Sequence, residues 1–199
     1  RAEAAFFLAQ STDPPIVHAL LKLLESDEVP VKVAALRGLS EVGCGLIFDE
    51  VKKLAKSDIS LEVRRAALNA IAKSGRNEGK NILIEALNDS NWEIRSSAIE
   101  WIANSGETFY ISPLLKELER DPDIFVKQTI IEALTRLKAI QAVPRLLHYL
   151  THKDLKDSVT KFFLSLEREH IPLIEQEAQS VDFQTKLILI EILKHLENK

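Results

Sequence analysis

The sequence predicts an all-α fold, a right-handed α-solenoid of about six stacked helical hairpins. The chain holds only 6 Gly and 7 Pro, fewer than a turn-rich β-sandwich uses. Hydrophobic residues make up 46% of the chain and charged residues 28%, which excludes an intrinsically disordered protein. In addition, one short apolar pattern recurs along the chain, and such a recurrence is typical of repeat proteins.

Four segments carry this pattern, and each is expected to form the second helix of a hairpin, called helix B. The segments start 32, 31 and 32 residues apart. Their apolar or small residues are spaced three and four apart, which places them on one helix face. The segments are residues 31–39, 63–71, 94–102 and 126–134.

Three of these segments are followed by a glycine, which predicts where each helix B ends. Gly43, Gly75 and Gly106 stand where the backbone can turn into the left-handed region without a Cβ clash. The fourth segment has Lys138-Ala139 at this place instead, so the end of that helix is less clearly marked.

A second apolar segment precedes each helix B and is expected to form the first helix of the hairpin, called helix A. Asp13 followed by Pro14 predicts the start of the first one, because Asp favours the N-cap and Pro the first turn. The predicted A helices run from Ile16 to Leu24, Ile47 to Leu54, Ile82 to Leu87, Ile111 to Leu118 and Val143 to Leu150.

The repeats predict a single array over residues 1–199. Residues 1–12 form a partial repeat, because the chain opens inside a B-type pattern. Clear repeats follow at 13–43, 44–75, 76–106 and 107–139, and divergent ones at 140–169 and 170–199. The chain contains no Met and starts at Arg1, so we expect a fragment of a longer protein.

An acidic residue recurs ahead of each helix B. Asp58 stands six residues before Arg64, Asp89 six before Arg95, and Asp121 six before Lys127. Taken with the small residues and the glycine stop, this pattern resembles HEAT repeats of the short type found in phycobilisome-lyase-like proteins. The resemblance covers residues 1–150 well and the remainder loosely. We expect the Asp and Arg or Lys residues to form a ladder that joins successive repeats and satisfies backbone groups of the A–B turns.

The resemblance implies that the B helices line a concave surface on which a partner binds. The implied function is a non-catalytic scaffold that binds a partner helix or peptide there. Trp101 replaces a small residue of the other repeats, so it either fills a gap between repeats or anchors a partner. Trp92 aligns with Val29, Leu61 and Ile124, which predicts a packing role. The expected partner-binding residues are Phe6, Arg37, Asn69, Lys73, Glu100, Trp101, Asn104, Phe125, Glu132 and Arg136.

The alternative is an enzyme or enzyme subunit on a HEAT-like scaffold. It would be a bilin lyase-like component or a DNA glycosylase-like nucleic-acid binder, for which Glu100, Trp101 and Arg136 are the nearest candidates. The net charge of −4 argues against nucleic acid, because phosphate contacts supply most of that affinity.

Residues for catalysis or metal binding do not stand out, so no catalytic residue, cofactor or metal is expected. His148 and His152 share one face of a predicted helix, but a third ligand is missing. Cys44 lies in a Gly-Cys-Gly turn without a sequence neighbour that would activate it. A single Cys favours a reducing, cytoplasmic setting.

The helix at residues 186–193 is apolar on more than one face. A terminal repeat normally needs a polar outer side. Three explanations stay open: a further repeat of a longer protein, self-association through this helix, or a local cap formed by residues 197–199. No apolar run is long enough to span a membrane.

Overall fold

The computed structural model describes residues 13–42 and 47–198, and within those ranges every regular element is helical. The all-α prediction is therefore confirmed. The chain divides into two compact units, Arg1–Trp101 and Ile102–Lys199. Phe6, Gly43 and Cys44, which the sequence singled out, lie outside the described residues.

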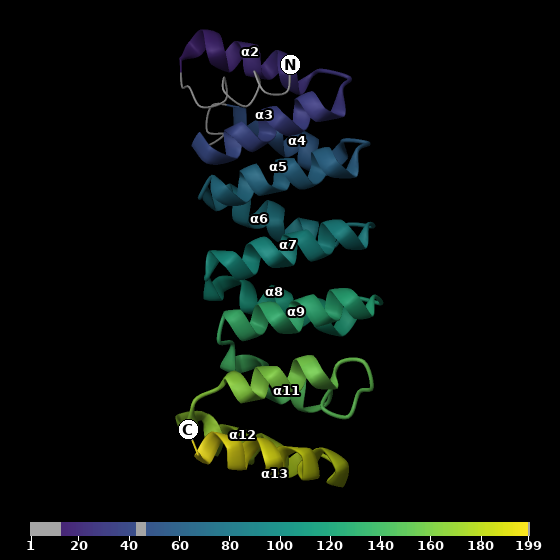
Figure 1. The fold of residues 1–199 in the computed structure, drawn as a ribbon, viewed down its shortest axis with the longest axis vertical. Coiled ribbons are helices and arrows are strands. Elements are labelled where there is room, and N and C mark those ends of the chain that lie inside the picture. The colour runs from purple at the N-terminus through teal and green to yellow at the C-terminus, as the bar shows by residue number, and fades with distance from the viewer. Residues whose placement is uncertain (1–12, 43–46, 199) are drawn as a thin grey trace. The chain divides into compact units, whose positions relative to one another are not determined.

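The first unit consists of helices that alternate between the predicted A and B types (Figure 1). The B-type helix α5 packs on the preceding B-type helix α3 and on its own A-type partner α4. Val63, Ala67 and Leu68 of α5 have exposed fractions of 0–1% and form its buried face. The helices are α2 (Pro14–Leu24), α3 (Val29–Val42), α4 (Phe48–Ser57), α5 (Leu61–Lys73), α6 (Asn77–Ala86) and α7 (Trp92–Ser105), the last of which continues into the second unit.

The second unit repeats the arrangement, and two of its A-type helices, α10 and α12, are shorter than those of the first unit. Its B-type helix α11 contacts both the preceding B-type helix α9 and the following one, α13. Ile130, Phe162 and Phe163 are fully buried in its core. The elements are η2 (Thr108–Tyr110), α8 (Ile111–Arg120), α9 (Ile124–Arg136), η3 (Ile140–Ala142), α10 (Val143–Leu147), α11 (Lys156–Ser165), η4 (Arg168–His170), α12 (Ile171–Glu177), η5 (Ala178–Ser180) and α13 (Phe183–Glu197).

The helix ends at Gly75 and Gly106 are confirmed by their backbone angles. Gly75 has a φ of 65° and Gly106 a φ of 69°, both in the left-handed region that glycine adopts without a Cβ clash. A Cβ atom placed on either glycine would meet no heavy atom within 4 Å, so the requirement is conformational rather than steric. Lys138 takes the same role in the next repeat with a φ of 49°.

The predicted Asp ladder is present in the first unit. Lys32 Nζ lies 2.8 Å from Asp58 Oδ2, and Arg64 Nη1 lies 2.8 Å from Asp89 Oδ2. Each pair joins a B helix to the A–B turn of the next hairpin. The second oxygen of each carboxylate accepts from the turn itself, because Asp58 Oδ1 accepts from Ser60 N and Asp89 Oδ1 from Asn91 N. One carboxylate thus holds its own turn and the neighbouring helix.

The predicted helix from Val143 to Leu150 ends earlier than the sequence indicates. Helix α10 closes at Leu147, and the next residues tighten into turns in which Tyr149 N donates to Leu146 O. This tightening keeps Leu150 buried with Leu147. His148 and His152 consequently do not share a helix face, and His152 Nδ1 accepts from Asp154 N instead.

None of the described helices has the length and apolar character that crossing a membrane requires.

Candidate functional site

The expected partner-binding residues of the first unit lie on the side of the B helices that faces away from the hydrophobic core, called the outward side below. Arg37 and Lys73 are exposed, and Asn69 is partly exposed. Lys73 Nζ lies 2.7 Å from Glu41 Oε1 on the preceding B helix. The hydrogen bond from Lys73, followed by its positive charge, lowers the pKa of Glu41 below the ordinary value. Charged groups therefore pair across adjacent B helices on this face.

One of the two tryptophans of α7 differs from what the sequence predicts. Trp92 was expected to pack, but 47% of its side chain is exposed. It stands at the first residue of the helix. Trp101 is partly exposed, and Glu100 beside it is exposed.

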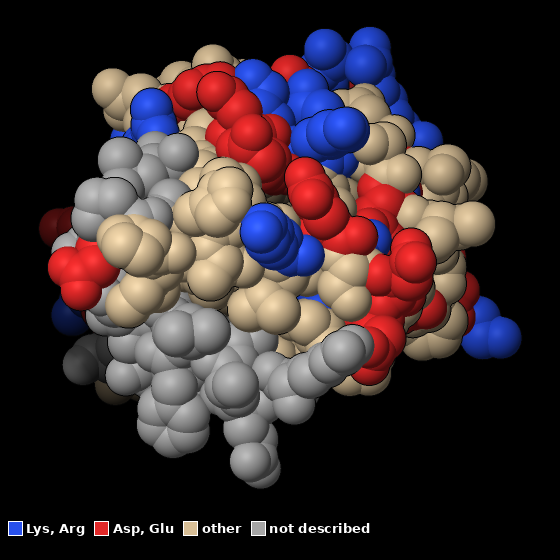
Figure 2. Space-filling model, turned by 90° about the horizontal axis from the view of Figure 1, so that it is seen from above, with Lys and Arg blue, Asp and Glu red and all other residues tan. Residues whose placement is uncertain are grey.

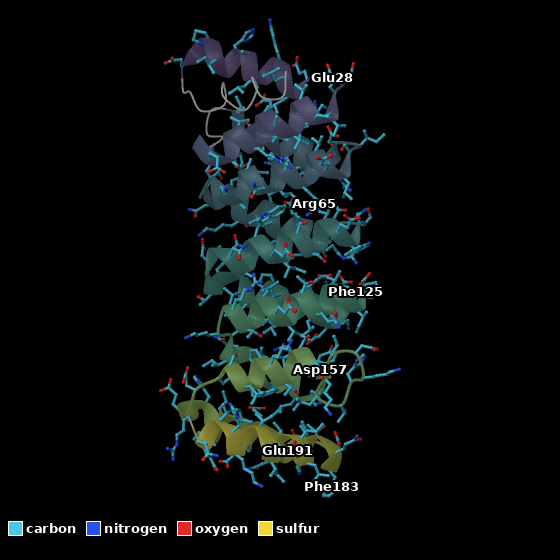
Figure 3. The ribbon with its side chains drawn as sticks, viewed as in Figure 1. Glu28, Arg65, Phe125, Asp157, Phe183 and Glu191 are labelled. Atoms are coloured by element: carbon cyan, nitrogen blue, oxygen red, sulfur yellow. The ribbon has the colours of Figure 1, made fainter. Side chains whose placement is uncertain are left out.

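The expected residues of the second unit are exposed as well. They are Asn104, Phe125, Glu132 and Arg136. Arg136 Nη1 donates to Asn104 Oδ1 over 3.3 Å, so α7 and α9 are linked at the positions that align with Glu41 and Lys73 in the repeats. Phe125 has 65% of its side chain exposed near the start of α9 (Figure 3).

A groove of about 300 Å³ runs between the B-type helices α11 and α13 of the second unit. Its apolar residues are Leu164, Ile188 and Ile192, the last of which is 3% exposed. Exposed polar groups surround them. The groove, called the α11–α13 groove below, is lined by Lys156, Thr160, Leu164, Ile188, Glu191, Ile192 and His195.

Sequence reasoning missed this groove, although the alignment of the repeats contains the signal. When Thr185-Lys186 is aligned on Val126-Lys127, Glu191 takes the place of Glu132 and His195 that of Arg136. Both thus continue rows already expected to bind a partner. The hollow itself depends on which side chains fill the space between two helices, and periodicity does not report that.

In earlier repeats a polar pair joins adjacent B helices at this place, as Lys73 does with Glu41 and Arg136 with Asn104. The groove differs because α11 has a short side chain at the corresponding position. Ser165 corresponds in α11 to Arg136, and its hydroxyl donates to Phe162 O of its own helix at 2.7 Å. The gap is left lined by the partly exposed Leu164 and Ile188. An apolar floor with a polar rim is suited to receiving a side chain of a partner.

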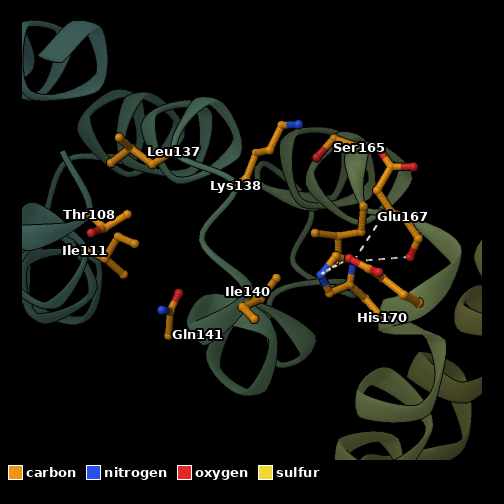
Figure 4. A pocket seen from close by; sticks show the side chains of 11 residues that line it. Thr108, Ile111, Leu137, Lys138, Ile140, Gln141, Ser165, Glu167 and His170 are labelled. Carbon is orange, nitrogen blue, oxygen red and sulfur yellow. Dashed lines mark hydrogen bonds and ion pairs between the residues drawn. The ribbon is translucent and has the colours of Figure 1, made fainter. Parts of the chain in front are cut away.

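A second hollow of about 400 Å³ lies where B helices turn into the following A helices (Figure 4). Lys138, Gln141 and Thr108 contribute to its wall. Glu167 and His170 on the other side form a capping box around η4, in which Glu167 N donates to His170 Nδ1 at 3.2 Å. The polar groups on this side of the hollow stabilise the turn at η4. Their presence there is therefore accounted for by the connection between two helices.

The described part of the chain holds no cluster of three or more His, Cys, Asp or Glu side chains arranged to bind a metal ion. Glu100 and Trp101 belong to the first unit and Arg136 to the second. The α11–α13 groove is lined by aliphatic side chains and separate charged groups.

Comparison with known proteins places the fold among helical repeats. The HEAT repeats family model matches residues 17–103, and the model of the PBS lyase HEAT-like repeat matches residues 1–26. A search of curated proteins gives no match.

Solved structures agree with the family matches. The complex of CpcE and CpcF of phycocyanin lyase from Nostoc sp. PCC7120 has a TM-score of 0.59 at 17% identity, covering 85% of this chain and 73% of that chain. A designed armadillo repeat protein has a TM-score of 0.54 at 22% identity, covering 90% of this chain and 99% of that chain. An engineered protein has a TM-score of 0.57 at 19% identity, covering 98% and 63% of the two chains. At these identities the likeness concerns the fold alone.

Proposed function

Because this chain is a HEAT-repeat protein with repeats of the phycobilisome-lyase-like type, we propose that it is an interaction scaffold. It binds a partner helix or an extended segment on the outward side of its B helices. The observation that carries the proposal is the α11–α13 groove, an apolar floor with a polar rim.

The groove has the composition of a small anchoring site. Burying one aliphatic side chain of a partner against Leu164 and Ile188 is worth about 1.5–3 kcal/mol. Lys156 at one end offers a cation, and Glu191 offers a carboxylate. A partner segment that carries one large apolar residue with polar residues of both signs beside it therefore fits.

The surface charge supports a protein partner. Figure 2 shows Lys and Arg side chains interspersed with Asp and Glu side chains on the face that it presents. The net charge of the chain is −4. A nucleic acid would instead require a field of positive charge along its phosphates.

The proposal is tested with peptides selected from a displayed library of random 16-residue sequences. The dissociation constants of the selected peptides are then measured by isothermal titration calorimetry. Thr160→Arg fills the groove with a long side chain, and Leu164→Ala removes part of its floor. Each variant is expected to weaken binding at least tenfold, which corresponds to about 1.4 kcal/mol.

Gln176→Arg is the matched control, because it adds the same side chain at an exposed position of α12. This control is expected to bind the peptides as the unaltered chain does. Affinities that are unchanged in Thr160→Arg and Leu164→Ala, with both variants folded by circular dichroism, would contradict the proposal. So would an equal loss in Gln176→Arg.

A second candidate is a subunit of a lyase complex. It is favoured by the PBS lyase HEAT-like repeat at residues 1–26 and by the similarity to the CpcE and CpcF complex. If the chain is such a subunit, we expect it to bind a free bilin. Binding would be measured as a change in the visible absorption spectrum of the bilin when the chain is added. An unchanged spectrum at an excess of chain would remove it and leave the scaffold proposal intact.

A further inference from the structure

The outward side of α13 carries an apolar stripe. Phe183, Leu187 and Ile190 have exposed fractions of 76%, 50% and 47%. Their spacing of four and three residues places them on one face of the helix. The opposite face packs into the unit through Leu189, Ile192 and Leu196, so the stripe is a separate surface from the core.

The stripe points away from the helices that α13 packs against. Figure 3 shows Phe183 at the start of α13 with its ring directed away from the rest of the unit. Ile188 and Ile192, which line the α11–α13 groove, lie well over 90° around the helix from Ile190 at 100° per residue. Occupying the groove therefore leaves Leu187 and Ile190 uncovered, although Glu191 borders both the groove and the stripe.

Opposite charges border the stripe on its two sides. At 100° per residue, Lys186 lies on one side of Leu187 and Ile190, and Glu191 lies on the other. Both side chains are exposed, and Lys186 Nζ also donates to Gln179 O of the same chain at 3.2 Å. Lys194 continues the stripe by one more turn. The pattern is that of a short two-stranded seam, with apolar residues at alternating steps of four and three and charges at its edges.

We propose that two copies of this chain pair through α13, with the two helices parallel about a two-fold axis. In this arrangement Leu187 and Ile190 meet the same residues of the second copy. Lys186 of each copy then lies beside Glu191 of the other, because residues five positions apart face each other across parallel helices. The interface contains this ion pair twice.

The charge pattern is what selects a second copy as the occupant. In an antiparallel pair each edge of the stripe would face the same edge of the other helix, which separates Lys186 from Glu191. In the parallel pair, the edge that carries Lys186 instead faces the edge of the other helix that carries Glu191. In the parallel register Lys194 faces Lys194 of the second copy, so its long side chain must extend to solvent and the apolar part of the seam ends at Ile190. The seam is short, because a 15-residue helix is about 22 Å long, so the dimer belongs to the weak class.

The proposal is tested by sedimentation equilibrium of the full chain from about 1 to about 500 µM, the range in which small interfaces associate. The unaltered chain is expected to pass from monomer to dimer. Leu187→Glu should remain monomeric, and since Leu187 is half exposed its circular dichroism spectrum should be unchanged. Lys186→Glu alone and Glu191→Lys alone should each weaken the dimer at least tenfold.

Two further samples separate the ion pairs from unspecific adhesion of apolar surface. The double variant Lys186→Glu, Glu191→Lys restores opposite charges and should dimerise as the unaltered chain does. An equimolar mixture of the two single variants should associate more tightly than either single variant, because each contact then joins unlike charges.

Three results would overturn the proposal. The first is an unaltered chain that stays monomeric throughout the range, which would leave the stripe to a different partner. The second is a Leu187→Glu variant that still dimerises. The third is a pair of single charge variants that dimerise as the unaltered chain does, because association would then not depend on the Lys186 and Glu191 contacts.

Discussion

Lys32 Nζ on α3 lies 2.8 Å from Asp58 Oδ2, and the side chain of Asp58 is only 5% exposed. The two residues belong to successive hairpins and are 26 positions apart in the chain. Arg64 and Asp89 repeat this relationship one hairpin later. A single hairpin of this size cannot bury its apolar side without the next hairpin. A contact that joins two successive hairpins therefore stabilises both of them.

Replacing Asp58 should destabilise the first unit. Asp58→Ala removes the partner of Lys32 and the acceptor for Ser60 N, and we expect a loss of about 2 kcal/mol in the free energy of unfolding. Asp58→Asn retains an acceptor for the turn and should lose less. Urea unfolding followed by circular dichroism measures both.

Lys56 provides the control for the ladder. It forms an ion pair with Glu85, in which the two side chains are 45% and 58% exposed. Lys56→Gln should therefore change stability by less than about 0.5 kcal/mol. If Lys56→Gln proved as costly as Asp58→Ala, the special role of the buried carboxylate would be wrong.

Lys138 occupies a position that favours glycine. Its φ of 49° strains a residue that has a Cβ atom. We expect Lys138→Gly to stabilise the chain by about 0.5–1 kcal/mol, whereas Gly75→Ala should destabilise it by about 1 kcal/mol. Thermal unfolding compares the two variants.

Lys138→Ala separates backbone strain from loss of the charge. Alanine retains the Cβ atom, so this variant should gain nothing. A gain equal to that of Lys138→Gly would indicate that removing the lysine side chain, rather than relieving the backbone, is responsible.

Tyr110 should make the chain sensitive to alkali. Burial, followed by the charge of Glu107, raises the pKa of Tyr110 to about 12. Because the folded-state pKa is the higher one, this contribution to stability is complete below the ordinary value of about 10 and is lost as the pH rises towards 12. At pH 11 the loss is about 1.4 kcal/mol.

Tyr110→Phe cannot ionise and should remove most of this loss between pH 9 and pH 11, an interval set by the ordinary tyrosine pKa. Tyr149 is the comparison, because burial, followed by the charge of Glu119, raises the pKa of Tyr149 as well. Tyr149 is more exposed than Tyr110, so Tyr149→Phe should have the smaller effect. The reverse order would contradict the assignment.

Asp182 caps the helix that bears the proposed dimer stripe. It accepts from Thr185 N at 3.0 Å and from Thr185 Oγ1 at 2.6 Å. The hydrogen bond from the Thr185 hydroxyl, followed by the one from its backbone N–H, lowers the pKa of Asp182. Its contribution is therefore present above the ordinary pKa and is lost as the pH falls through the lowered value.

Asp182→Ala should loosen the first turn of α13 at neutral pH. The amide protection factor of Thr185 should be lower in this variant. It should also no longer fall on acidification, because the cap that is protonated in the unaltered chain is missing. Unchanged exchange at Thr185 would show that tertiary packing, rather than the cap, fixes the turn.

Much of the fold follows from local patterns. The spacing of Asp58 and Arg64 predicts the ladder position, and Gly75 and Gly106 predict the helix ends, because each of these features depends on a few neighbouring residues. Lys138 could not be assigned with the same clarity, since nothing in its own chemistry favours a positive φ. The early end of α10 was missed because Leu146, Leu147 and Leu150 satisfy a helical pattern and are also buried by a tighter turn.

The candidate site was less accessible to sequence reasoning. The outward direction of Arg37, Glu100 and Glu132 follows from helix periodicity, and the structure finds all three exposed. Pairs such as Lys73 with Glu41, and the opening between α11 and α13, depend on distances between helices. Trp92 was misjudged for a related reason, because burial at the first residue of a helix depends on the turn beside it.

Methyl NMR tests the central claim most directly. The chain, labelled at Ile, Leu and Val methyl groups, is titrated with a peptide selected from the library. We expect the largest shift changes on Leu164, Ile188 and Ile192 of the α11–α13 groove, with Ile174 of α12 unaffected. Changes centred on α8 and α12, with the groove methyls unmoved, would contradict it.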